Sequence, residues 1–67
     1  MNEMTAEERS QYLFELFSFL DIDNKLKKRT AQRSCALILV GEIMKDLDIK
    51  SRDFVYWSNV KFNLFEI

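Results

Sequence analysis

The first part of the chain alternates between apolar and polar positions with the period of an α-helix. Apolar residues at positions i, i+3, i+4 and i+7 form one stripe, which consists of Leu13, Leu16, Phe17 and Leu20. Thr5 and Glu8 have the spacing of a capping box, in which each side chain accepts a hydrogen bond from the backbone N–H of the other residue. The pattern predicts a helix over residues 5–20, whose apolar face is widened by Tyr12, Phe14 and Phe19.

Polar residues interrupt this stripe at 21–24, and a second stripe begins after them. Asp and Asn favour turns and helix N-termini, so Asp23 or Asn24 is expected to begin a helix over residues 24–47. Its apolar face consists of Ala36, Leu37, Leu39, Val40, Ile43, Met44 and Leu47. Gly41 lies within this helix and costs about 1 kcal/mol relative to Ala. That cost is either tolerated or reflects close approach of another helix across Ser34 and Gly41.

Residues 54–67 fit either a helix or a strand. Aromatic and β-branched residues are dense there, and residues 60–64 alternate as a strand does. No second strand candidate lies nearby, however, and an unpaired strand is unstable. A helix over residues 53–66, capped by Ser51 or Asp53, is therefore favoured. One of its faces carries Trp57, Val60, Leu64 and Ile67, and another carries Phe54, Phe62 and Phe65.

The composition indicates an all-α fold in a single helical domain, residues 1–67. The chain has no proline, one glycine and no Asn-Gly or Asp-Gly hairpin turn. A domain this short buries only about 60% of its unfolded surface, and such domains usually gain stability from disulfides, a metal or a partner subunit. One cysteine and no histidine leave only the partner subunit. We therefore expect a three-helix hairpin or bundle completed by self-association, through Phe14, Phe19, Phe54, Phe62 and Phe65.

A basic cluster is the most distinctive charged feature. It lies within nine residues that hold no acid, and it consists of Lys25, Lys27, Lys28, Arg29 and Arg33. Cations in the first turn of a helix oppose its dipole, and a broken local rule often marks a functional site. The basic cluster is either a solvated face with ion pairs to Asp21, Asp23 or Glu15, or a surface for phosphate groups or an acidic partner. The net charge of −1 implies no general attraction to nucleic acid.

The residues needed for catalysis are scarce. Histidine, the commonest general acid–base residue, is absent, and phosphate-cradling loops need more than one glycine. Paired carboxylates occur only at predicted helix ends or in connectors, where capping and solvation explain them. We expect no enzymatic activity, no cofactor and no metal.

The longest apolar run, residues 35–40, is far shorter than the roughly 20 residues of a membrane span. The acidic N-terminus is not followed by the apolar region of a secretory signal. A lone thiol suits a reducing compartment. These features predict a cytoplasmic protein that does not enter a membrane.

Two short motifs resemble a group of small, mostly uncharacterised bacteriophage proteins. The first motif is Ala36-Leu37-Ile38 with Val40, Glu42 and Ile43, and the second is Tyr56-Trp57 with Val60 and Lys61. Proteins of this group carry an ALI-x-V helix with a Glu-Ile pair, followed by a YW-x-x-VK C-terminal helix. The match covers under half of the chain, and Gly41 stands where an acidic residue is expected. The resemblance implies a phage or prophage origin, a location in the host cytoplasm and no catalytic residues.

The expected function is that of a small homo-oligomeric interaction protein that binds a host macromolecule, possible partners being a host protein and further copies of itself. An alternative is a small nucleic-acid or nucleotide-binding protein that uses the basic cluster for phosphates and Tyr56 or Trp57 for base stacking. Ionic strength separates the two, because phosphate binding weakens steeply with salt.

Overall fold

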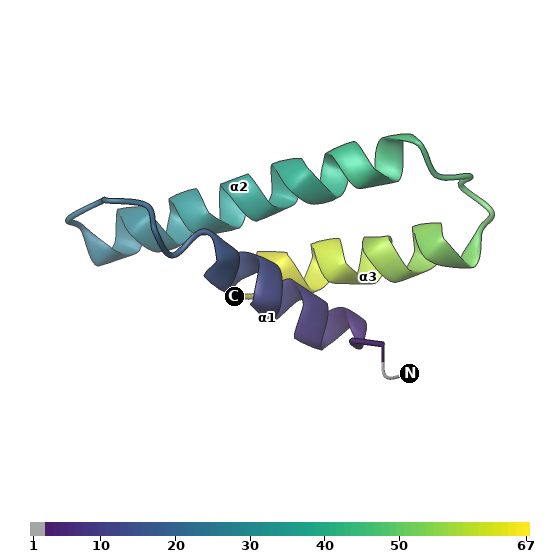
Figure 1. Cartoon of the computed structure of the whole chain (residues 1–67), viewed down its shortest axis with the longest axis horizontal. Coiled ribbons are helices and arrows are strands. Elements are labelled where there is room, and N and C mark those ends of the chain that lie inside the picture. Colours follow the sequence, from purple (N-terminus) through teal and green to yellow (C-terminus); the bar gives the residue numbers. More distant parts are fainter. Residues whose placement is uncertain (1–2) are drawn as a thin grey trace.

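Three helices make up the computed structural model, which describes residues 3–67 (Figure 1). They are α1 (Ala6–Leu16), α2 (Lys25–Lys45) and α3 (Arg52–Phe65). The described residues contain no strand, so the predicted all-α fold is confirmed and the strand alternative for the last segment is wrong. No helix of residues 3–67 has both the length and the apolar character needed to cross a membrane.

Each helix begins at a cap that the sequence predicted. The Glu8 backbone N–H donates to Thr5 Oγ1 at 3.1 Å, and the Thr5 N–H donates to Glu8 Oε1 at 2.9 Å, which completes the capping box. Asn24 Oδ1 accepts from the first turn of α2, and Ser51 Oγ accepts from the Phe54 N–H at the start of α3. Polar side chains therefore satisfy one or two of the backbone donors that each helix leaves free at its N-terminus.

Helix α1 ends at Leu16, four residues earlier than the stripe predicted. Gln32 of α2 contacts this end, where its Nε2 donates to the Phe14 carbonyl at 2.9 Å. In a continuing helix that carbonyl would accept from the Ser18 N–H, which instead bonds to the Glu15 carbonyl at 3.0 Å. The chain then turns at residues 17–19. As a result Leu16, predicted to face the core, is 46% exposed.

Helices α2 and α3 run side by side in opposite directions, and α1 crosses the C-terminal half of α3 (Figure 1). Each helix contributes two residues to the buried core, which consists of Leu13, Phe14, Ala36, Val40, Val60 and Leu64. Half-buried residues, including Trp57 and Ile67, pack around it, as predicted for that face of α3. Gly41 lies on the exposed side of α2, and a Cβ built there meets no atom within 4 Å. Among residues 3–67, therefore, no second helix approaches Gly41.

Candidate interaction surface

Exposed apolar side chains are the main feature of the molecular surface. Of the described residues, nine large hydrophobic ones are at least 45% exposed, more than the six that form the core: Tyr12, Leu16, Phe19, Leu26, Ile38, Ile49, Val55, Phe62 and Phe65. Single exposed apolar residues are ordinary on protein surfaces, whereas contiguous ones mark binding sites. The question is therefore which of these residues share a face.

Three of them lie along one side of α3. Val55, Phe62 and Phe65 are 57%, 67% and 55% exposed, and the half-buried Ser58 lies between them. With Ser58 included, the four residues are spaced three, four and three apart. They form one stripe, since positions three and four apart are neighbours on a helix. The stripe points away from Val60 and Leu64, which are fully buried. We call Val55, Ser58, Phe62 and Phe65 the α3 stripe.

The five residues predicted for self-association have different surroundings. Phe19 is 73% exposed in the turn after α1, and its ring lies 6.2 Å from that of Phe17. Phe62 and Phe65 belong to the α3 stripe, and Phe54 is half-buried beside it. Phe14 is only 7% exposed, so its assignment to an intermolecular surface is wrong. It belongs to the core cluster, and its ring also lies under the Arg29 guanidinium of α2.

Val55 was not among the residues predicted for self-association, although its position in the sequence indicated it. Val55 precedes Phe62 by seven residues, which is two turns of a helix, and therefore had to share its face.

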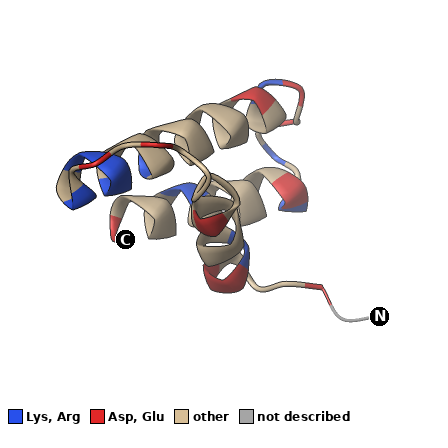
Figure 2. Cartoon of the chain, turned by 60° about the vertical axis from the view of Figure 1, so that its left-hand side comes forward, with Lys and Arg blue, Asp and Glu red and all other residues tan. Residues whose placement is uncertain are grey.

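The basic cluster lies at the N-terminal end of α2, which projects beyond the end of α3 (Figure 2). Two of its members have contacts within the chain. The Arg29 guanidinium lies 5.3 Å from the centroid of the Phe14 ring, a cation–π contact. Arg33 Nη1 donates to the Ile67 carbonyl at 3.0 Å and so ties α2 to the end of α3. Lys25 and Lys27 are exposed, and Lys28 is half-exposed.

The ion pairs considered for the basic cluster do not form. Among residues 3–67 the salt bridge present joins Lys45 to Glu42 at 3.8 Å, on the exposed surface of α2. Asp21, Asp23 and Glu15 are exposed, and Glu15 Oε1 accepts from Gln11 Nε2 at 3.2 Å. The arginines of the cluster thus serve the fold at least in part, and the lysines are available to anions.

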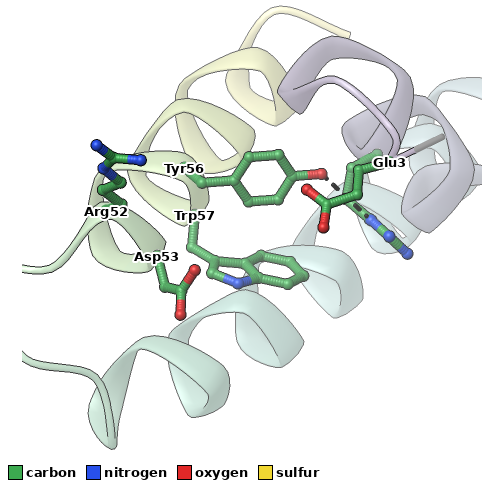
Figure 3. Close-up of a pocket in the computed structure, with 6 residues that line it drawn as sticks. Glu3, Arg52, Asp53, Tyr56 and Trp57 are labelled. Carbon is green, nitrogen blue, oxygen red and sulfur yellow. Dashed lines mark hydrogen bonds between the residues drawn. The ribbon is translucent and has the colours of Figure 1, made fainter. Parts of the chain in front are cut away.

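A hollow of about 450 Å³ lies where the segment before α1 meets α3 (Figure 3). Its lining carries both signs of charge and two aromatic rings: Glu3, Arg9, Arg52, Asp53, Tyr56 and Trp57. The two rings meet edge to face, with centroids 5.4 Å apart and planes at 89°. The Tyr56 hydroxyl donates to the Met4 carbonyl at 2.8 Å and accepts from Arg9 Nε at 3.5 Å.

These bonds give Tyr56 a structural role. They hold the segment before α1 against α3, so the hydroxyl is already engaged on both of its hydrogen-bonding sides. Over residues 3–67, no group of three or more His, Cys, Asp or Glu side chains is placed to hold a metal ion.

No protein-family model, curated protein or solved structure matches this chain. The resemblance to small phage proteins therefore stays a prediction, and function must be argued from the surface.

Proposed function

We propose that this chain is a small homo-oligomeric interaction protein without catalytic activity, which associates with itself through the α3 stripe. The supporting observation is the exposure of Val55, Phe62 and Phe65 on one helix face. Aromatic side chains offer large buried area at low entropic cost and are frequent in the centres of interfaces. A six-residue core leaves a marginal monomer, which burial of this stripe would stabilise.

A further partner is part of the proposal. The surfaces that self-association leaves open, including Phe19 and Leu26 beside the α1–α2 connector, are available to a second macromolecule. The resemblance to phage proteins suggests that this partner belongs to a host cell.

The test is the oligomeric state of the chain and of two matched variants. The parent protein should be larger than a monomer at micromolar concentration in sedimentation and light scattering. Phe62→Ser should weaken this association by at least about tenfold, because tenfold corresponds to only about 1.4 kcal/mol and interface aromatics often contribute more.

Ile38→Ser is the matched control, since Ile38 is 68% exposed, as Phe62 is at 67%, but lies on α2. It should leave the association unchanged. A parent protein that is monomeric at these concentrations, or equal effects of the two substitutions, would contradict the proposal.

Phosphate binding by the basic cluster is a second candidate function. The observation in its favour is that Lys25, Lys27 and Lys28 make no ion pair with the described residues and lie at a helix N-terminus, where the helix dipole also attracts anions. Lys25→Ala combined with Lys27→Ala should abolish a salt-sensitive mobility shift of oligonucleotides.

Lys45→Ala combined with Lys50→Ala removes the same charge elsewhere and should leave the shift intact. If the parent protein shifts no oligonucleotide at low ionic strength, this second function is wrong.

A further inference from the structure

The α3 stripe has the spacing of a coiled-coil seam. Val55, Ser58, Phe62 and Phe65 occupy alternating steps of three and four residues, which are the a and d positions of two heptads. Along this seam the two smaller residues come first and the two large aromatic residues follow. This order distinguishes one end of the stripe from the other.

We infer that a second copy of this chain packs its own α3 antiparallel against the α3 stripe, with a two-fold axis between Ser58 and Phe62. The inference rests on the proposed function and adds the orientation and register of the partner. In this register Val55 faces Phe65 of the second copy. Ser58 faces Phe62 of the second copy, and the two-fold axis repeats both layers.

Size matching favours this orientation. Every layer then pairs one small side chain with one phenyl ring, so the layers have similar widths and fill the space between the helices. A parallel pairing in register would place Ser58 on Ser58 and Phe62 on Phe62. The helices would be held apart at one layer and leave a void at the next, which loses packing contacts.

The charges beside the stripe fit an isologous antiparallel contact. Arg52 and Glu66 lie two heptads apart on one edge of the stripe, and both are exposed without an ion pair among the described residues. In the antiparallel register Arg52 of each copy lies beside Glu66 of the other. On the other edge, Lys61 lies close to Lys61 of the second copy near the axis, which weakens the contact.

A parallel pairing has different charge neighbours, and this makes the orientation measurable. There Lys61 would lie beside Glu66 of the second copy, and Arg52 would have no acidic neighbour on α3. Arg52 and Lys61 therefore respond to substitution in opposite ways in the two orientations.

The contact is small. Helix α3 has 14 residues and is about 21 Å long, so the seam holds only four layers of side chains. Four layers bury less than the roughly 800 Å² per partner of a standard interface. We expect dissociation constants in the micromolar range, which sedimentation equilibrium measures directly.

The test is a charge exchange across the proposed contact. Arg52→Glu alone and Glu66→Arg alone should each weaken dimerisation several-fold. Each substitution places like charges at positions 52 and 66 in both symmetry-related contacts of the dimer. The double variant Arg52→Glu/Glu66→Arg should restore the parent affinity to within about twofold. Both substitutions favour the α3 dipole, an acid at its start and a base at its end, so loss of dimer cannot be attributed to loss of the helix.

Lys61→Gln supplies an independent readout, since it should tighten an antiparallel dimer and weaken a parallel one. Lys50→Glu in the α2–α3 connector is the control for net charge and should change nothing. If Phe62→Ser disrupts the dimer but the double exchange does not restore it, self-association stands and the inferred register is wrong. A parent chain that stays monomeric would overturn both.

Discussion

Gln32 shows how one buried polar side chain shapes the fold. It is 7% exposed, and its amide donates to the Phe14 carbonyl near the end of α1, which also accepts from the Phe17 N–H. Nothing in the sequence indicates which carbonyl a glutamine within a helix will reach. The bond therefore could not be predicted, and neither could the early end of α1 beside it.

Gly41 is the residue whose substitution has the plainest expected effect. Gly41→Ala should raise the free energy of unfolding by about 1 kcal/mol, because alanine restricts the unfolded chain and its Cβ meets only open space. Chemical denaturation of the Phe62→Ser variant, with and without Gly41→Ala, measures this in the monomer.

The same substitution answers the question left open for Ser34 and Gly41. If a helix of another molecule packs closely there, Gly41→Ala should weaken that association in the parent background. An alanine variant that is less stable as a monomer would contradict the open surroundings of Gly41.

At the scale of elements, helix starts were predictable and one helix end was not. Thr5, Asn24 and Ser51 act through short, local hydrogen bonds, so their sequence signal is strong. The end of α1 has no glycine or proline and depends on α2, which a local pattern cannot register. The composition of residues 54–67 fitted either a helix or a strand. The helix was predicted because no partner strand was available, and this prediction is confirmed.

The capping box makes α1 sensitive to acid. The backbone N–H of Thr5 and then its side chain, by hydrogen bonding to the Glu8 carboxylate, lower the pKa of Glu8 below its usual value of 4.5. A depressed pKa adds stability above the unfolded value, and this stability is lost as pH falls through the folded pKa. Glu8→Gln should therefore lose less stability than the parent between about pH 6 and about pH 3.

Glu7→Gln is the matched control for this effect, since Glu7 is exposed in the same first turn but its side chain takes no part in the capping box. Thermal unfolding followed by circular dichroism across this range provides the measurement. Identical acid sensitivity in the Glu7 and Glu8 variants would mean that the box does not act through its charge.

At the scale of the molecule, the packing of three helices decides which aromatic residues stay outside. Phe14 and Phe62 were both predicted to lie outside the main core-facing stripe of their helix. Phe14 is nevertheless only 7% exposed, whereas Phe62 is 67% exposed. The difference arises from where α1 crosses α3, a geometry set by contacts between distant residues. The candidate interaction surface was thus predictable for α3, whose two faces are clearly separated, and not for α1.

The contact between α1 and α3 also decides when this chain can fold during its synthesis. The ribosome adds roughly 5–20 residues per second and makes α1 long before α3. Until Val60 and Leu64 have been made, Leu13 and Phe14 lack the α3 residues that cover them. The hydrogen bond from the Tyr56 hydroxyl to the Met4 carbonyl also requires α3. A nascent chain stalled before residue 60 would leave Leu13 and Phe14 open to chaperones and proteases, so folding must wait until α3 has been made.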